Sequence, residues 1–454
     1  MRNKILLFLA AAALSGCSEV LDVRPTSSVP AEVAITDAAG ARAAQAGMYA
    51  GLQAGGLYGH RIIDWTELMS DNARFTGTFD DYKDADNLAL RSDNNTVALI
   101  WNAAYNTINR ANQIIKNVPS IATLSDTEKN QIVGEAYFIR ALMYHDLVRL
   151  FGGVPLRTEP VSSAADASTI TRATAPETYT LIMADIAKAK TLVTAPKSQT
   201  RKASLGAVYA LEARVRLYQA DYAGAEAAAA QVEALGYSLA PNFSDLFEAT
   251  GQNTPEDIFR VEFTPTQAQS LSFYYLPKGA LGGRYEVAPT IGPVSIVAAF
   301  DPASNGSIAT YAPTDRRGIW SISRNGTRAY VSKFRNSAGD EDLHVIRLGE
   351  VILIRAEALA RLGRLPEAVA EYNRLRVRAG LAADPTTGRT QQDVLDAIAR
   401  ERRLELAFEG DRWPDLIRMG QAPAATQGSA TQSLLPIPQQ EIETAPGITQ
   451  NTGY

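Results

Sequence analysis

The sequence has few of the side chains on which nucleophilic and metal-dependent catalysis usually relies. It contains one cysteine, Cys17, and three histidines, His60, His145 and His344, which lie far apart along the chain. A single thiol cannot form a disulfide within the chain, and a zinc site would need carboxylates for most of its ligands, which is uncommon. Cys–His catalysis is excluded in practice because the only thiol lies close to the amino terminus.

The chain also lacks an excess of basic charge and long apolar runs. Its formal net charge is −5, so a nucleic-acid partner is not expected. Beyond the first residues, no stretch approaches the roughly 18 uninterrupted apolar residues of a membrane-spanning helix. No serine has a histidine nearby in the sequence, and no glycine-rich phosphate loop follows a predicted strand. Serine catalysis and phosphate binding of that kind are therefore unsupported.

The amino terminus carries an export signal. Residues 1–16 combine Arg2 and Lys4 with the apolar run ILLFLAAAAL, and the sequence LSG directly precedes Cys17. Small residues before a cysteine resemble a bacterial lipobox, which predicts cleavage before Cys17 and acylation of that residue. An ordinary secretory leader with a chance cysteine is the alternative. Residues 17–36 then form a lipid-anchored tether with two prolines.

Helical periodicity dominates the rest of the chain, with apolar residues recurring at three- and four-residue steps. The predicted helical segments are residues 37–51, 96–118, 125–151, 174–193 and 347–378, the last with a tight turn at 362–364. The run GEAYFIRA from Gly134 matches GEVILIRA from Gly349, and a weaker copy begins at Ala207. We therefore predict a mainly α fold, a tetratricopeptide-like helix–turn–helix scaffold with long irregular, partly β insertions.

Two irregular segments, residues 53–95 and 261–342, are rich in aromatic and polar residues. Flat rings stack on sugar faces or peptide groups, while Asp, Asn and Arg bond to hydroxyls, and long ordered loops are often functional. The candidate ligand-binding residues are Tyr58, Asp71, Asn72, Arg74, Phe75, Phe79 and Tyr82 in the first segment, and Tyr274, Arg284, Tyr285 and Trp320 in the second. For each ring, packing beneath its own loop is an equal alternative.

The first irregular segment also carries four closely spaced aspartates, Asp80, Asp81, Asp84 and Asp86. They could hold calcium, but the stretch lacks the glycine and the distal glutamate of an EF-hand loop. A solvated acidic loop is the favoured interpretation. We therefore predict no cofactor or metal, with calcium as the open alternative.

Residues 401–418, ERRLELAFEGDRWPDLIR, interleave many charges with large apolar residues. Glu401, Glu405 and Glu409 are spaced four apart and would repel one another unless arginines intervene. The favoured interpretation is a structural latch of partly buried ion pairs. The alternative is a carboxylate pair for glycoside hydrolysis, formed by Glu401 and Glu405 or by loop aspartates.

This charged segment is preceded by IRLGEVILIRAEALA and followed by LLPIPQQEI and a closing QNTGY. Together with the lipobox, these motifs resemble the SusD/RagB family of nutrient-uptake outer-membrane lipoproteins. The resemblance implies a SusD-like amino-terminal helical region, residues 37–260, that includes the aromatic loop 53–95. The carboxy-terminal SusD/RagB region, residues 261–454, would hold an insertion at 261–342 and a helical repeat at 344–419.

The resemblance implies a non-catalytic function at the cell outer membrane. A member of this family is a surface-exposed, lipid-anchored protein that faces outside and captures an oligosaccharide. It then passes that nutrient to a SusC-like TonB-dependent transporter. A peptide-binding member of the same family is the alternative, and a lipid-anchored glycoside hydrolase or a pure protein-assembly adaptor would be a different class of protein.

Overall fold

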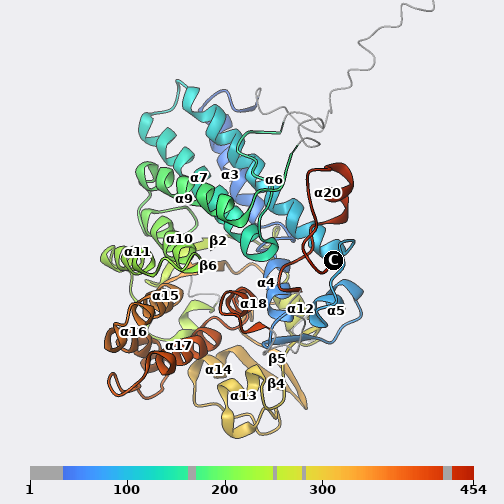
Figure 1. Ribbon diagram of the computed structural model, residues 1–454, viewed down its shortest axis with the longest axis vertical. Coiled ribbons are helices and arrows are strands. Elements are labelled where there is room, and N and C mark those ends of the chain that lie inside the picture. The colour runs from blue at the N-terminus through green and yellow to red at the C-terminus, as the bar shows by residue number, and fades with distance from the viewer. Residues whose placement is uncertain (1–33, 162–169, 249–252, 279–282, 423–431) are drawn as a thin grey trace, which may run out of the picture.

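The computed structural model describes residues 34–161, 170–248, 253–278, 283–422 and 432–454 (Figure 1). The predicted leader, the acylation of Cys17 and most of the tether lie outside these residues. Within the described ranges, no helix combines the length and the apolar character that crossing a membrane requires.

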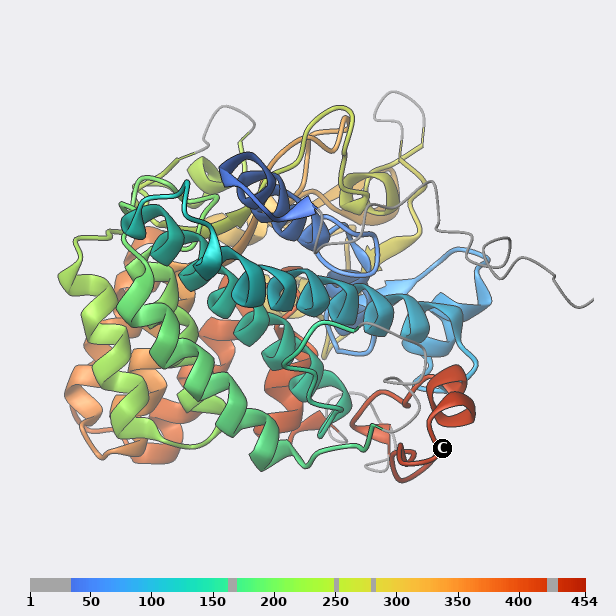
Figure 2. The same cartoon turned by 90° about the horizontal axis from the view of Figure 1, so that it is seen from above.

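Nine long helices build the scaffold, which confirms the predicted mainly α fold within the described part of the chain. They are α3 (Ala38–Leu52), α6 (Asn95–Asn117), α7 (Asp126–Phe151), α9 (Ala175–Leu192), α10 (Leu205–Tyr218), α11 (Tyr222–Ala234), α15 (Leu348–Arg361), α16 (Leu365–Arg378) and α17 (Gln391–Glu405). Neighbours in sequence pack as pairs, and α11 contacts α15, so the pairs stack in one column (Figure 1). Seen from above, α6 crosses most of the width of the molecule (Figure 2).

Turn glycines and small residues explain why the pairs form. The predicted turn between α15 and α16 contains Gly363, whose φ of +79° favours glycine. Helix α7 ends at Phe151, because Gly152 with φ +76° stops it. Where helices cross, small residues are fully buried, as at Ala225 in α11 and Ala368 in α16. The broad apolar faces are thus covered by the next pair in the column.

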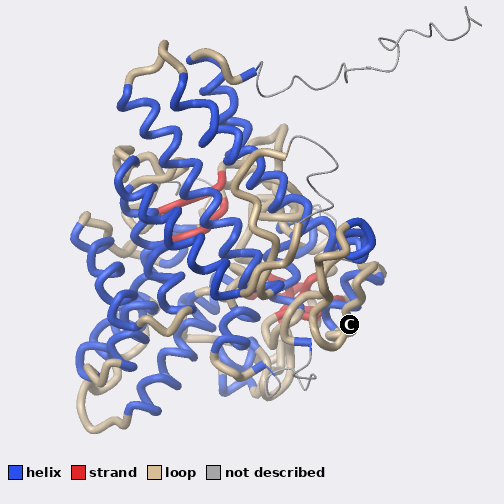
Figure 3. Tube along the Cα trace, turned by 45° about the horizontal axis from the view of Figure 1, so that its top comes forward, coloured by secondary structure: helices blue, strands red, loops and turns tan. Residues whose placement is uncertain are grey.

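Among the described residues, three two-stranded antiparallel sheets interrupt the helices (Figure 3). They pair β1 (Ala73–Phe75) with β3 (Val287–Pro289), β2 (Asp257–Val261) with β6 (Leu343–Arg347), and β4 (Ile322–Asn325) with β5 (Arg328–Val331). The β1–β3 sheet matters most for the site, because it joins the two irregular segments and places Phe75 opposite Val287.

The predicted return to helix at His344 is wrong. Residues Leu343–Arg347 form β6, and α15 begins only at Leu348. His344 Nε2 lies 2.8 Å from the Asp257 carboxylate in the partner strand β2. All five residues of β6 are buried, and a segment as short as LHVIR has no periodicity that separates a buried strand from a helix.

Shorter helices lie in the irregular segments and near the carboxy terminus. They are α4 (Arg61–Leu68), α5 (Asp80–Asp86), α12 (Leu271–Tyr275), α13 (Ile296–Phe300), α14 (Arg316–Ser321), α18 (Arg412–Arg418) and α20 (Gln439–Thr444). The carboxy-terminal tail packs on the scaffold: the Leu435 amide donates to Leu150 O (2.7 Å), and the Asn451 side chain donates to Phe151 O (2.9 Å).

Candidate functional site

The charged segment 401–418 does not form one continuous helix. Helix α17 ends at Glu405, because Phe408 and Gly410 adopt φ values of +66° and +92°. The expectation that Glu409 continues the four-residue series of Glu401 and Glu405 is therefore wrong. The sharp turn instead directs Glu409 toward a different pair of cations, Lys333 and Arg347.

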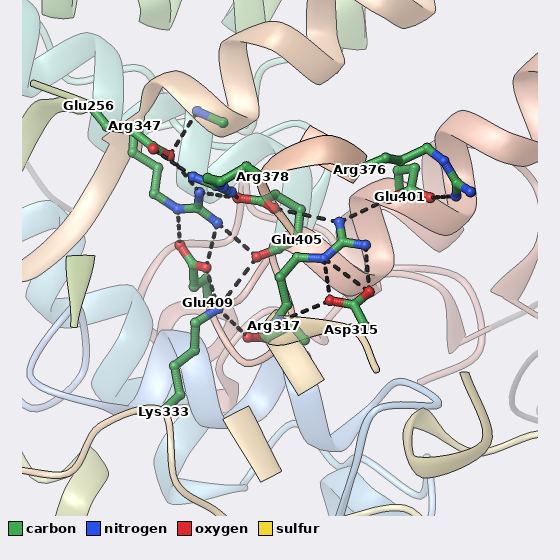
Figure 4. A network of polar contacts seen from close by, with 12 residues as sticks. Glu256, Asp315, Arg317, Lys333, Arg347, Arg376, Arg378, Glu401, Glu405 and Glu409 are labelled. Atoms are coloured by element: carbon green, nitrogen blue, oxygen red, sulfur yellow. Dashed lines mark hydrogen bonds and ion pairs between the residues drawn. The ribbon is translucent and has the colours of Figure 1, made fainter. Parts of the chain in front are cut away.

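Arginines do separate the three glutamates, as the sequence requires (Figure 4). The Glu405 carboxylate is bonded by Arg347 (2.5 Å) and by Arg378, and Arg317 of α14 lies 3.6 Å away. Because these arginines come from α14, β6 and α16, the network ties the second insertion and the helical column together. We call this network the ion-pair latch. It comprises Glu256, Asp315, Arg317, Lys333, Arg347, Arg376, Arg378, Glu401, Glu405 and Glu409.

Neighbouring cations in the latch lower the pKa values of Glu405 and Glu409. Burial alone would raise the pKa of Glu409, but the charges of Arg347 and Lys333 outweigh it and lower the pKa to about 2. The Glu401 carboxylate is fully buried, with Arg317 at 2.9 Å and Arg376 at 2.6 Å. A glycosidase acid needs a raised pKa and access to substrate. Glu401 and Glu405 therefore do not form the acid–nucleophile pair that the hydrolase alternative requires.

Three of the predicted ligand residues already form hydrogen bonds or ion pairs with other side chains of the protein. The Tyr58 hydroxyl donates to Asp146 (2.6 Å). Asp71 accepts two bonds from Arg412, at 2.7 and 2.9 Å. Asn72 is fully buried, and its side chain donates to Glu67 (3.0 Å) while accepting from an arginine of α17. We therefore withdraw these three from the candidate ligand contacts and treat them as structural residues.

The Arg412→Ala variant should be less stable by about 2 kcal/mol, because it removes the bidentate partner of the nine-tenths buried Asp71. Arg403 still lies 3.2 Å from Asp71. The loss of stability is therefore smaller than for a buried carboxylate that has no cation nearby. Urea unfolding measures the effect, with Arg91→Ala at an exposed ion pair as the matched control. Equal unfolding midpoints for Arg412→Ala and the parent would contradict a structural role for this pair.

Four other predicted residues come together with Phe273, which was not predicted, in an aromatic platform formed by Phe75, Phe79, Tyr82, Phe273 and Tyr274. The rings of Tyr82 on α5 and Tyr274 on α12 stack with centroids 5.5 Å apart and an interplanar angle of 19°. Phe75 and Phe79 lie 5.2 and 6.3 Å from the Tyr82 ring, and Phe273 lies 5.4 Å from Tyr274. Strand pairing between β1 and β3 brings these two distant segments side by side.

Only part of the platform faces solvent. Phe79 is 38% exposed and Phe273 is 44% exposed, whereas Tyr82 is 2% exposed and supports them from below. The Arg284 guanidinium lies 5.0 Å from the Phe79 ring centroid and 5.7 Å from that of Phe273. His60 stacks on Tyr274 at 4.9 Å. The exposed rings are thus held on a rigid base, which limits the entropy lost on binding.

A pocket of about 370 Å³ adjoins the platform. It is lined by Thr76, Gly77, Thr78, Pro277, Lys278, Arg284, Tyr285, Glu286, Asn325 and Arg328. Tyr285 adopts φ +66°, an unusual conformation for a bulky residue, and the Arg328 guanidinium lies 4.8 Å from its ring centroid. The pocket therefore combines aromatic, hydroxyl and charged groups next to two exposed rings, a lining typical of ligand sites.

The remaining two candidates differ in position. Arg74 is exposed in the middle of β1, between the platform residue Phe75 and Ala73. Trp320, a candidate of the second segment, lies in α14 and lines a different pocket together with Phe247 and Arg335. The Arg335 guanidinium covers the Trp320 ring at 3.6 Å, so this face of the indole is already occupied.

Phe273, Lys278 and Arg328 were not predicted from the sequence, although weak signals existed for Phe273 and Arg328. Phe273 stands directly before Tyr274 in the run FYY, and Arg328 follows the Asn325–Gly326 turn signal of a hairpin. Neither signal indicates which ring stays exposed or which pocket a hairpin will close. That information depends on the tertiary arrangement alone.

The four aspartates considered for calcium do not converge. Asp81 accepts a hydrogen bond from Thr96 (2.5 Å) and Asp84 one from Asn94 (3.3 Å), so both serve the start of α6. Within the described ranges, no three His, Cys, Asp or Glu side chains gather as a metal site would need. The described residues therefore contain no cluster of acidic side chains that would support the calcium alternative.

Two family models match different parts of the chain. The model described as "SusD family" matches residues 304–454, and the one described as "Starch-binding associating with outer membrane" matches residues 19–217. SusD-like protein P38 of Formosa agariphila is 29% identical over 92% of this chain and 91% of its own length. The starch-binding protein SusD of Bacteroides thetaiotaomicron is 26% identical over 73% of this chain and 74% of its own.

Solved structures share the fold. A laminarin-binding SusD-like protein superposes with a TM-score of 0.77 at 23% identity, covering 92% of this chain and all of its own. A SusD superfamily protein from Bacteroides vulgatus reaches a TM-score of 0.81 at 21% identity, covering 92% of this chain and 99% of its own. These likenesses show that the helical column with its insertions is an architecture the chain shares with known proteins.

Proposed function

The chain belongs to the SusD-like family, and from that premise we propose that it binds an oligosaccharide on the aromatic platform without cleaving it. The observation that carries the proposal is the pair of exposed rings, Phe79 and Phe273, fixed beside a polar pocket. Sugar rings present apolar C–H faces that stack on such rings, and their hydroxyls need polar partners nearby.

The relatives favour a glycan over other ligands. One relative is named a starch-binding protein, and structural neighbours are named a laminarin-binding protein and a surface glycan-binding protein. The peptide-binding alternative uses the same flat rings, but no observation specific to this chain favours it. A glycan ligand is therefore the better-supported proposal.

A binding role also agrees with the state of the acidic residues. The carboxylates weighed for hydrolysis, Glu401 and Glu405, are buried and paired with arginines. Glu286, which lines the pocket, is bonded to Arg284 at 2.8 Å. A retaining or inverting glycosidase needs two carboxyl groups flanking one bond, and the pocket lining supplies a single carboxylate among the described residues.

We further propose that a lipid at Cys17 anchors the protein to the outer membrane, facing outside, and that a SusC-like TonB-dependent transporter receives the glycan. Support comes from the lipobox-like sequence before Cys17 and from the family description, which mentions association with the outer membrane. Acyl chains suffice for such an anchor, since each buried CH₂ contributes about 0.8 kcal/mol.

Binding measurements on the purified protein with a panel of oligosaccharides and peptides test the proposal. We expect saturable binding of at least one oligosaccharide class and none of the peptides. Binding of peptides alone would overturn the glycan assignment in favour of the peptide-binding alternative. Failure of every oligosaccharide, while a transporter co-purifies, would favour the assembly-adaptor alternative.

A further inference from the structure

The pocket beside the platform carries positive charge that the carboxylates of the described residues only partly neutralise. Lys278, Arg284 and Arg328 line it, and Glu286 is the one carboxylate among its described lining residues. Arg284 Nε donates to Glu286 at 2.8 Å, so these two charges offset one another. No ion pair joins Lys278 or Arg328 to a carboxylate of the described residues, which leaves two cations for a ligand.

A second observation points to a missing partner in the same pocket. Tyr285 is 8% exposed, and its buried hydroxyl has no hydrogen-bond partner among the described residues. Burial raises the pKa of this phenol, against the opposing charge of Arg328, so the hydroxyl keeps its proton and can donate. Most buried polar atoms in proteins have a hydrogen-bond partner, either a protein group or an ordered water.

The backbone at Tyr285 is held in a conformation that costs free energy. Its φ of +66° places a bulky residue in the left-handed region, and the Thr76 hydroxyl donates to its carbonyl at 2.7 Å. Strain of this kind clusters at ligand sites, where surrounding contacts maintain it. Here it fixes the phenol in the pocket, beneath Arg328.

We propose that this pocket binds an anionic substituent of the glycan, so that the natural ligand is an acidic oligosaccharide. This substituent is either the carboxylate of a uronic acid or a sulfate ester. Both groups carry negative charge and oxygen atoms that accept hydrogen bonds from the donors of this pocket. Arg328 offers a planar fork of donors, Lys278 a point charge and the Tyr285 hydroxyl a neutral donor. The inference rests on the proposed glycan-binding function and adds the ligand class.

The geometry assigns separate tasks to the two halves of the site. Phe79 and Phe273 receive the apolar face of one sugar, and the adjoining pocket receives the charged substituent of a neighbouring position. The formal net charge of −5 provides no general attraction for an anionic glycan, so the attraction has to come from local cations such as Lys278 and Arg328.

Matched ligand pairs test the proposal by calorimetry on the purified protein. One pair is a uronate-containing oligosaccharide and its carboxyl-reduced form, and the other is a sulfated oligosaccharide and its desulfated form. We expect at least one charged ligand to bind ten-fold or more tightly than its neutral partner. The preference should shrink as salt rises from 50 to 500 mM, since screening weakens exposed charge pairs. The pair with the larger preference identifies the anion.

Single substitutions test whether the preference for the charged ligand arises in this pocket. Arg328→Gln and Lys278→Gln should each reduce the ratio of charged-ligand to neutral-ligand affinity about five-fold or more, while the melting temperature stays near the parental value. Arg324→Gln is the matched control, because Arg324 lies on the same hairpin but donates to Ala309 O and does not line the pocket. An unchanged preference in both pocket variants would overturn the assignment of the anion to this pocket.

Different results would refute the glycan-binding function and the anionic ligand. Equal binding of charged and neutral ligands, lost on Phe79→Ala, would refute the anionic ligand and leave the glycan-binding function intact. Absence of binding to every oligosaccharide would refute both. Preference for the neutral partner in each pair would refute the anionic ligand alone.

Discussion

Replacing both Phe79 and Phe273 with alanine should weaken glycan binding about 30-fold or more, with little change in stability. Each exposed ring contributes roughly 1–2 kcal/mol of stacking and burial against a sugar, and about 1.4 kcal/mol corresponds to a factor of ten. The two side chains are 38% and 44% exposed, so their loss leaves no large cavity. Calorimetric titration with a bound oligosaccharide measures the affinity, and thermal unfolding measures the stability.

The matched control for this variant is Val294→Ala, which removes an apolar side chain that is 84% exposed in the same insertion. It should bind as the parent does. Tyr82→Ala is a poor substitute for the test, because Tyr82 is almost fully buried and its loss should lower the melting temperature. Parental affinity in the Phe79→Ala/Phe273→Ala double variant would place the glycan away from the platform.

Replacing Glu405 with alanine should destabilise the protein by about 3–5 kcal/mol, because it leaves buried arginines without the carboxylate they share. Arg347 and Arg378 both bond to Glu405, and Arg317 lies within ion-pair distance. Such a loss is a large fraction of the roughly 5–15 kcal/mol that keeps most domains folded. Urea unfolding of the soluble protein measures it.

Glu405→Gln is the companion variant if the alanine variant does not accumulate, because it keeps the shape and one acceptor while removing the charge. It should also unfold at lower urea than the parent. Glu367→Ala is the control: its carboxylate pairs with Arg364 on the surface, and such pairs contribute little. A parental unfolding midpoint for both Glu405 variants would contradict the stabilising role of the ion-pair latch.

Much of the scaffold could be predicted because helical periodicity is a local signal. The matching runs from Gly134 and Gly349 predicted equivalent helices, and these runs lie in α7 and α15. Errors arose where a local signal is ambiguous. The buried strand β6 is too short to show a usable periodicity, and the positive φ of Phe408 breaks a helix that its sequence alone would extend.

The candidate site could be predicted only in part, for a related reason. Phe79 and Tyr274 were both candidates, but their proximity depends on the β1–β3 pairing between residues more than 200 positions apart. Sequence also cannot separate an exposed ring from a buried one, as Tyr58 shows by bonding to Asp146 inside the scaffold. Arg328 went unrecognised because its partner Tyr285 is distant in sequence.

The most direct test of binding without catalysis follows one oligosaccharide through a titration. The purified protein is mixed with a bound oligosaccharide, and heat, new reducing ends and the chain length of the recovered sugar are measured together. We predict saturable binding with the ligand recovered intact and no new reducing ends. Reducing ends that accumulate over many turnovers, and that persist in a repurified preparation, would contradict the account.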